Sequence, residues 1–350
     1  MNENKIRVAD FIMNRLHEKY GVKYISLITG NGALVLNDAL GKIKDKIVPI
    51  CCHHEQDAGY VALGYSKYTN KLSVVTPTTG CASTNCITPL LAAYQDHVPI
   101  LFLSGNVALK QTSRYHKKYN HVHLKKLGTQ ELDILEIIKP LTKYSVMVED
   151  GKFIKALLDK AIDIALTPPF GPVWIDLPAD IGSSFIEEEN LVEYEKPLLH
   201  LNEARWTERL DKLKEDFKNY NKPLVLAGNG IRLSNTQDQL KLFIEKYKIP
   251  CVATYGGIDL LDYNHPLYLG GPIGVKPCRA SNFALQNCDL LLSLGACLNV
   301  PQVGYMGEKF APQAKKIVID LDAENHKKNI GVKIDKIIEC ELGEFFKYML

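Results

Sequence analysis

Residues 51–65 read Cys-Cys-His-His-Glu-Gln-Asp-Ala-Gly-Tyr-Val-Ala-Leu-Gly-Tyr, and they follow the apolar run Ile47 to Ile50. The apolar run is typical of a buried strand, and a helix is expected to begin near Glu55. The stretch therefore places an acid at the junction of a strand and the following helix. A carboxyl group in this position loses water on folding. It can then donate a hydrogen bond or exchange a proton with a ring nitrogen.

Short apolar runs alternate with helical patterns on both sides of this junction. The alternation predicts an α/β fold with two doubly wound parallel-sheet domains, the second of them Rossmann-like. A polar cluster at 187–190 interrupts the alternation, so we expect domains at 1–183 and 205–350 and a linker at 184–204. The expected strands are 24–28, 47–50, 72–76, 99–103 and 173–177 in the first domain, and 223–227, 250–253, 289–294 and 316–320 in the second.

The composition is that of a soluble globular protein, with 46% apolar and 23% charged residues among 350. A net charge of +2 without a basic run gives no reason to expect a nucleic-acid partner. No apolar stretch reaches the length of a membrane span, so we expect no membrane partner and a cytoplasmic location. The nine cysteines include no Cys-x-x-Cys pair, which favours reduced thiols over a zinc site and predicts no metal site in this chain.

Three interpretations of Glu55 follow from the residues alone. The first is a structural acid at a helix start, where the helix dipole favours negative charge. The second is a His53-His54-Glu55 metal site, which the missing i,i+4 spacing of helical zinc sites makes improbable. The third is an acid that activates a bound cofactor. The wider sequence favours the third.

Six sequence blocks occur in an order and spacing that resemble the pyrimidine-binding domain of thiamine-diphosphate (ThDP) enzymes of the acetolactate-synthase large-subunit type. The likeness extends over nearly all of residues 5–180, and six ordered blocks are far more specific than any one of them. The blocks are His-Glu-Gln at 54–56, Ala through Gly-Tyr at 58–65, Thr-Gly-Cys-Ala-Ser-Thr-Asn at 79–85, 98–105, Gly-Thr-Gln-Glu at 128–131 and Gly-Pro-Val-Trp-Ile-Asp-Leu-Pro at 171–178.

The resemblance implies roles for individual residues. Glu55 corresponds to the catalytic acid that hydrogen-bonds the aminopyrimidine ring of ThDP, so that the thiazolium can attack a 2-oxo acid. Gln130 falls in the block that lies near the substrate, although an exposed helix-start amide is an equal alternative. The expected cofactor-binding residues are Gly30, Asn31 and Gly32 in one turn, His54 beside the acid, and Thr79, Gly80 and Asn85 in a second turn. For the 30–32 turn, a tight strand-to-helix connection is an equally good explanation.

Four segments of the second half, at 222–230, 249–254, 289–295 and 316–322, resemble the central domain of the same enzymes. In acetolactate synthases this domain holds FAD partly through an Arg-Phe-Asp-Asp-Arg segment. Here residues 296–302 read Ala-Cys-Leu-Asn-Val-Pro-Gln, so FAD is not expected. A dehydrogenase interpretation of the Gly-Asn-Gly turn at 228–230 is weak, because Leu233 stands where a third glycine is needed.

The family binds the cofactor's diphosphate and Mg²⁺ through Gly-Asp-Gly followed downstream by Asn-Asn. Neither motif occurs in these 350 residues. We therefore expect a 2-oxo-acid decarboxylase or carboligase that obtains its diphosphate-binding domain from a partner chain or a missing C-terminal region, with a homodimer as the default assembly. The alternative is a non-catalytic binding or assembly module that has kept the fold.

Overall fold

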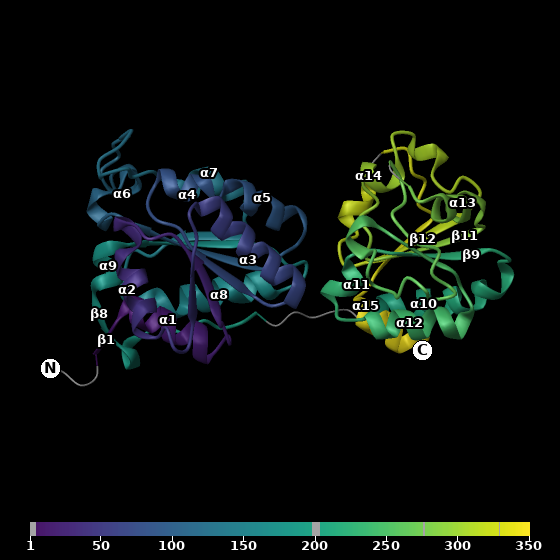
Figure 1. Cartoon of the computed structure of the whole chain (residues 1–350), viewed down its shortest axis with the longest axis horizontal. Coiled ribbons are helices and arrows are strands. Elements are labelled where there is room, and N and C mark those ends of the chain that lie inside the picture. The colour runs from purple at the N-terminus through teal and green to yellow at the C-terminus, as the bar shows by residue number, and fades with distance from the viewer. Residues whose placement is uncertain (1–4, 198–203, 276, 329) are drawn as a thin grey trace. The chain divides into compact units, whose positions relative to one another are not determined.

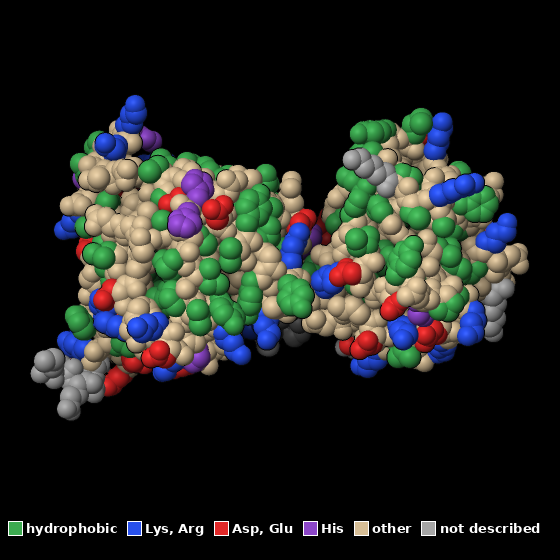
Figure 2. Space-filling view, viewed as in Figure 1, with side chains coloured by type: hydrophobic (Ala, Val, Ile, Leu, Met, Phe, Trp, Pro, Cys, Tyr) green, Lys and Arg blue, Asp and Glu red, His purple; other side chains and the backbone are tan. Residues whose placement is uncertain are grey.

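The structure is a computed structural model that describes residues 5–197, 204–275, 277–328 and 330–350. The chain forms two compact units that divide between residues 198 and 199 (Figure 1). Charged and apolar side chains are mixed over the visible surface of each unit (Figure 2). No helix among the described residues is long and apolar enough to cross a membrane.

A six-stranded parallel sheet forms the centre of the first unit, which confirms the predicted fold class. The strand order along the sheet is β3 (Val48–Cys51), β2 (Tyr24–Leu27), β4 (Ser73–Thr76), β5 (Ile100–Asn106), β7 (Val173–Pro178) and β6 (Tyr144–Met147). The chain runs from β2 outward to β3 and then returns past β2 to β4. The order therefore reverses between β2 and β4, and such a reversal opens a crevice at the carboxyl ends of the strands.

Helices cover both faces of this sheet (Figure 1). One face carries α1 (Val8–Glu18), α2 (Leu34–Lys42), α8 (Ile154–Leu166) and α9 (Ala179–Ser183), and the other carries α3 (Glu55–Thr69), α4 (Cys81–Asn85), α5 (Ile87–Gln95) and α7 (Ile134–Ile138). Helix α6 (Ser113–Tyr119) follows β5. Short 3-10 turns lie at η1 (Asn31–Ala33), η2 (Leu109–Gln111), η3 (Lys139–Leu141), η4 (Gly151–Phe153) and η5 (Glu188–Asn190).

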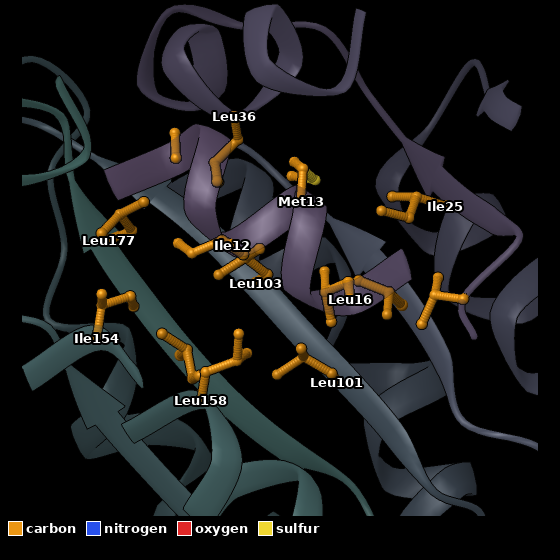
Figure 3. Close-up of a cluster of buried hydrophobic side chains, with 14 of the residues drawn as sticks. Ile12, Met13, Leu16, Ile25, Leu36, Leu101, Leu103, Ile154, Leu158 and Leu177 are labelled. Atoms are coloured by element: carbon orange, nitrogen blue, oxygen red, sulfur yellow. The ribbon is translucent and has the colours of Figure 1, made fainter. Parts of the chain in front are cut away.

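The larger core of the first unit lies between the sheet and α1 (Figure 3). Ile12, Met13 and Leu16 recur at helical spacing on one side of α1 and are completely buried. They pack in the same cluster as Leu101 and Leu103 of β5. Each such side chain contributes on the order of 1.5–3 kcal/mol through burial, so this face of the sheet is firmly fixed. Rigid strands position the turns at their carboxyl ends.

The first unit extends beyond the expected boundary at residue 183. Strand β8 (Phe185–Glu187) pairs antiparallel with β1 (Lys5–Arg7), and Leu191 is buried in the larger core. The expected linker at 184–204 is therefore shorter in the structure, because its first part completes a two-stranded sheet. A polar cluster concealed this strand, since an edge strand buries few of its side chains. Residues 198–203 of the expected linker lie outside the described residues.

The second unit contains a five-stranded parallel sheet of the kind predicted. Its strand order is β10 (Cys251–Ala253), β9 (Pro223–Ala227), β11 (Leu290–Leu294), β12 (Lys315–Asp320) and β13 (Lys336–Glu339), which reverses between β9 and β11. Its helices are α10 (Ala204–Asp216), α11 (Gly230–Leu233), α12 (Gln237–Tyr247), α13 (Arg279–Asn287), α14 (Val300–Val303) and α15 (Leu342–Met349), with 3-10 turns η6 (Phe217–Asn219), η7 (Tyr255–Gly257), η8 (Gly307–Lys309) and η9 (Glu324–Lys327).

Candidate functional site

The residues that the sequence singled out in the first unit follow three neighbouring strands. The turn at 30–32 follows β2, Glu55 follows β3, and the turn at 78–80 follows β4. Because these strands are parallel and hydrogen-bonded side by side, their carboxyl ends lie at one edge of the sheet. The reversal of strand order between β2 and β4 lies at the same edge. The structure thus brings the predicted catalytic acid and both predicted cofactor turns to one place.

Glu55 is the first residue of α3, and its side chain is buried with 9% exposure. The amide Nδ2 of Asn85 donates a 2.8 Å hydrogen bond to Oε2 of Glu55. Asn85 is the last residue of α4, so this bond joins the end of one helix to the beginning of another. The described residues donate no hydrogen bond to Oε1, which leaves this oxygen available to a ligand. Asn85 was predicted near the cofactor, but its contact with Glu55 could not be deduced from the sequence.

His54 precedes Glu55 as the cap of α3. Its Nδ1 accepts a 3.2 Å hydrogen bond from the backbone N–H of Gln56, so the proton of a neutral ring lies on Nε2. His53 and His54 are both exposed, unlike Glu55. Within the part of the chain that the structure describes, no group of three His, Cys, Asp or Glu side chains is arranged to hold a metal ion. His54 therefore fixes the beginning of α3, and with it the backbone of the acid.

Close packing explains the glycines of the two turns. A Cβ added at Gly32 would lie 1.5 Å from Oγ1 of Thr79, and one added at Gly30 would lie 2.7 Å from the side chain of Thr78. The backbone N–H of Ala33 donates a 3.2 Å hydrogen bond to Oγ1 of Thr78. The turn after β2 therefore needs glycine in order to contact the turn after β4. This contact accounts for Gly32 whether or not a cofactor is bound.

Gln130 meets the second turn through its backbone. Gly80 has a positive φ of 60°, and a Cβ added there would lie 1.5 Å from the carbonyl oxygen of Gln130. The side chain of Gln130 is exposed, and its backbone has a φ of 57°, in the left-handed region. The structure thus brings Gln130 to the site, and a substrate contact by its side chain stays a prediction.

Glu131 is a buried acid that the sequence analysis did not single out. It is 4% exposed, and its Oε1 accepts hydrogen bonds from the backbone N–H of Ser113 at 2.9 Å and from Oγ of the same serine at 2.8 Å. Its Oε2 is buried without a partner among the described residues. Glu131 therefore fastens the beginning of α6 to the segment that contacts Gly80.

Asp176 is a second buried acid that the sequence analysis left without a role. It lies in β7, is 1% exposed, and accepts hydrogen bonds from Oγ of Ser104 at 2.6 Å and Nδ2 of Asn106 at 2.7 Å. Burial raises the pKa of Asp176 to about 7, and the two hydrogen bonds oppose that rise. Gly105, between its two partners, packs against the carbonyl oxygen of Gly32. The hydrogen bonds of Asp176 thus hold the part of β5 that packs against the 30–32 turn. In the sequence, a single acid within an otherwise apolar strand could have pointed to this network.

The second unit has a similar glycine contact at its own strand reversal. A Cβ added at Gly228 would lie 2.1 Å from the carbonyl oxygen of Gly295, so the turns after β9 and β11 touch closely. Beyond Gly295, Nζ of Lys328 donates to the carbonyl oxygen of Cys297 and, at 2.9 Å, to Oδ1 of Asn299. Residues 296–302 stand where acetolactate synthases have the Arg-Phe-Asp-Asp-Arg segment, and here Lys328 binds this segment.

Two family models match the chain, one in each unit. Residues 6–137 match the thiamine pyrophosphate enzyme N-terminal TPP binding domain, and residues 210–343 match the thiamine pyrophosphate enzyme central domain. The matched residues include Glu55, both turns and Gln130. The chain therefore belongs to the thiamine pyrophosphate enzyme family, as the sequence motifs predicted.

Curated relatives narrow the likeness to acetolactate synthases. The chain is 33% identical to the acetolactate synthase large subunit of Lactococcus lactis subsp. lactis (strain IL1403), over 90% of this chain and 52% of the relative. It is 29% identical to the acetolactate synthase isozyme 2 large subunit of Escherichia coli (strain K12), over 90% of this chain and 54% of the relative. The chain thus spans about half the length of these relatives.

Proposed function

We propose that this chain supplies the cofactor-activating part of a ThDP-dependent enzyme that decarboxylates a 2-oxo acid or joins it to a second carbonyl compound. One observation carries the proposal: the buried carboxyl of Glu55 is oriented by Asn85 at the edge where both cofactor turns meet. Glu131 and Asp176 are also buried and hydrogen-bonded, but Glu55 differs from them because it begins a helix at the strand ends beside both predicted cofactor turns and because the described residues leave its Oε1 without a hydrogen bond. The relatives named as acetolactate synthases support the same reaction class.

The residues present fit the pyrimidine ring of ThDP. Glu55 offers Oε1, to which the described residues donate no hydrogen bond, for the ring nitrogen, and the turns at 30–32 and 78–80 lie at the same edge of the sheet. The cofactor, when bound, supplies the carbon nucleophile and the electron sink for decarboxylation. Fixed donors and acceptors of this kind lower a barrier because they need no reorganisation during the reaction.

The protein groups themselves hold and move one proton. Glu55 exchanges a proton between its carboxyl group and the pyrimidine nitrogen. Asn85 restricts the carboxyl to one orientation by binding Oε2, which directs Oε1 toward the ligand. His54 caps α3 and so fixes the position of the Glu55 backbone. Gly32 and Gly80 let the turns at 30–32 and 79–80 and the backbone of Gln130 pack closely together at this edge of the sheet.

The diphosphate and its Mg²⁺ are proposed to bind to residues outside 1–350. Mg²⁺ needs carboxylate and carbonyl oxygens besides those of the phosphates. The Gly-Asp-Gly and Asn-Asn motifs that would provide them do not occur in this sequence. The outer side of α3 supports a partner, because Tyr60, Val61 and Tyr68 are 43%, 39% and 93% exposed on the helix that begins with Glu55. We propose that a domain carrying the diphosphate-binding residues covers this side, in a dimer or in a complex with a second chain.

The test is carbon dioxide release by the complete enzyme, meaning this chain together with the chain or region that carries the diphosphate-binding residues. Pyruvate is the first 2-oxo acid to supply, with ThDP and Mg²⁺ added or omitted. We expect release that requires both additions and that falls sharply in Glu55→Gln. An assembly that binds ThDP but decarboxylates no 2-oxo acid would contradict the proposal and favour a non-catalytic assembly module.

A further inference from the structure

The segment between β5 and Glu131 is strongly basic. Residues 97–130 contain no Asp or Glu, whereas the whole chain contains 40 acids and 42 Lys and Arg. We name residues 107–130 the basic loop. It contains Lys110, Arg114, Lys117, Lys118, Lys125 and Lys126, together with His116, His121 and His123. A nearly neutral chain therefore concentrates positive charge in one connection of the first unit.

Acids from elsewhere in the unit neutralise only one half of these cations. Arg114 pairs with Asp133 at 3.1 Å, Lys117 with Glu136 at 3.7 Å, and Lys118 with Glu149 at 2.7 Å. By contrast, the other three cations, Lys110, Lys125 and Lys126, form no ion pair in the described chain. All three are exposed. The unneutralised charge of the basic loop thus comes from these three lysines.

The fold brings the two ends of the basic loop together, so that the backbone at Lys110 runs near the segment of Lys125 and Lys126, although fourteen or more residues separate Lys110 from them. The backbone N–H of Gly128 donates a 3.0 Å hydrogen bond to the carbonyl oxygen of Gln111, which joins the two ends of the basic loop. Lys110 precedes Gln111 directly, and Lys126 lies two residues before Gly128. Figure 1 shows the connection projecting next to α6, and Figure 2 shows Lys and Arg side chains at that projection.

The basic loop is fastened to the candidate site. Glu131 holds the beginning of α6 through Ser113, and the preceding carbonyl group of Gln130 packs on Gly80 in the second cofactor turn. The segment that carries Lys125 and Lys126 therefore runs directly into the site residues. A charge held at the entrance of a site attracts ligands of opposite sign and raises their association rate by roughly 10- to 1,000-fold at low salt.

We propose that Lys110, Lys125 and Lys126 bind a phosphate or carboxylate group of the substrate, remote from the carbonyl group that reacts. The substrate part of this proposal rests on the proposed function, whereas anion binding by the loop does not. Three unpaired ammonium groups suit a small anion of two or more charges, because each can donate hydrogen bonds that are assisted by charge. The proposal thus adds a class of substrate to the reaction: a small molecule that carries a phosphate or carboxylate group in addition to the carboxylate of the 2-oxo acid.

The test measures binding of tripolyphosphate and of citrate to the full chain by calorimetry, without ThDP, at low and high salt. The variant Lys110→Gln/Lys125→Gln/Lys126→Gln removes the three unpaired cations. A matched control, Lys23→Gln/Lys44→Gln/Lys46→Gln, removes three exposed lysines beside the amino ends of β2 and β3, at the opposite edge of the sheet. Circular dichroism confirms that both variants are folded.

We expect binding that weakens at least tenfold in the loop variant and changes less than twofold in the control. Preference for tripolyphosphate or for citrate distinguishes phosphate from carboxylate. No binding by the wild-type chain, equal losses in both variants, or affinity that grows with the length of an added oligonucleotide would each overturn the proposal. In the complete enzyme, the loop variant is expected to raise KM for substrates that carry a second, remote phosphate or carboxylate group, to leave KM for pyruvate unchanged, and to leave kcat unchanged. If the chain binds anions but the complete enzyme decarboxylates nothing, the proposed function fails and the anion site stands.

Discussion

Asn85 donates a hydrogen bond of 2.8 Å from its amide Nδ2 to Oε2 of Glu55. The two residues are thirty positions apart, at the end of α4 and the beginning of α3. A buried carboxyl that is held by a neutral amide keeps one orientation without being locked into an ion pair, so it remains able to exchange a proton. This relationship fixes one oxygen of Glu55 and leaves Oε1 without a donor among the described residues, at the edge where the two predicted cofactor turns meet.

The first prediction concerns proton exchange by Glu55. Glu55→Gln keeps the size of the side chain and an oxygen for Asn85, but it cannot exchange a proton. In the complete enzyme, deuterium exchange at C2 of bound ThDP should fall by roughly 100-fold or more, in line with the usual contribution of general acid–base catalysis. Nuclear magnetic resonance of the quenched cofactor measures the exchange. The exposed acid Asp57, on the same helix, provides the control as Asp57→Asn.

The second prediction concerns the contact between the two turns. Gly32→Ala adds a Cβ 1.5 Å from Oγ1 of Thr79, so one turn must move. We expect a loss of about 1–3 kcal/mol in the free energy of unfolding, together with weaker ThDP binding by the complete enzyme. Gly41 in α2 is the matched control, because a Cβ there would meet nothing within 4 Å. Gly41→Ala should stabilise the chain by about 0.4–1 kcal/mol.

A double variant tests whether this contact is the cause. Thr79→Ala removes Oγ1 and should return part of the stability lost in Gly32→Ala. The recovery should be incomplete, since Cβ of Thr79 would still lie 2.8 Å from the new atom. Chemical denaturation of the two single variants and the double variant measures the free energy of unfolding of each. If the losses in the double variant are additive, the contact between Gly32 and Thr79 is not their cause.

The third prediction concerns the diphosphate. The chain alone should bind ThDP weakly in the presence of Mg²⁺, because the diphosphate and its metal ion carry most of the anchoring charge. Calorimetry with the chain alone and with the complete enzyme gives the comparison. Equally tight binding by both would mean that the diphosphate site lies within these 350 residues.

The fold could be predicted from the alternation of apolar runs with helical patterns and from the glycine turns between them. Buried parallel strands are apolar along their whole length and commonly end at glycine. The strands at 24–28 and 223–227 were found in this way. The edge strands β3 and β10 were predicted from their apolar runs, whereas β1, β6, β8 and β13 were missed, since they bury few of their side chains. The sequence between the strands at 72–76 and 99–103 predicts one helix at 83–94, whereas the structure has two helices, α4 and α5, which meet at Cys86.

Only the part of the candidate site that lies in the sequence motifs could be predicted. His54-Glu55-Gln56 and the turn at 79–85 identified the acid and its surroundings. The contacts of Glu131 with Ser113 and of Asp176 with Ser104 and Asn106 join residues distant in sequence, and no local pattern announces such pairs. The charge of the basic loop can be counted in the sequence, but the pairing of three of its cations with distant acids and the joining of its two ends at Gln111 and Gly128 appear only in the fold.

The fourth prediction concerns stability in acid. Burial alone would raise the pKa of Asp159, but hydrogen bonds from Arg15, Tyr20 and Lys19 outweigh it and lower the pKa to about 2. A lowered pKa means that the stabilisation is complete above the ordinary pKa of Asp, near 4, and is lost as the pH falls toward 2. Asp159→Asn should therefore cost about 3 kcal/mol at pH 7, and the difference from wild type should shrink below pH 4.

Urea denaturation between pH 2 and pH 7 measures this effect. The exposed Asp45 provides the control, since Asp45→Asn should change the free energy of unfolding by less than about 0.5 kcal/mol. A difference between Asp159→Asn and wild type that stays constant down to pH 2 would show that the charge of Asp159 is not its source.

The last prediction concerns flavin. FAD's pyrophosphate needs backbone N–H donors or cationic side chains. In the second unit, the turn after β9 can offer backbone donors, but the segment at 296–302 has no arginine and is held by Lys328 through Cys297 and Asn299. The fork-shaped, charge-assisted contact that makes such binding tight is therefore missing there. Purified protein should be colourless, without flavin absorbance and without FAD released on heating. A yellow preparation with one FAD per chain would contradict this expectation and would place the chain with flavin-containing acetolactate synthases.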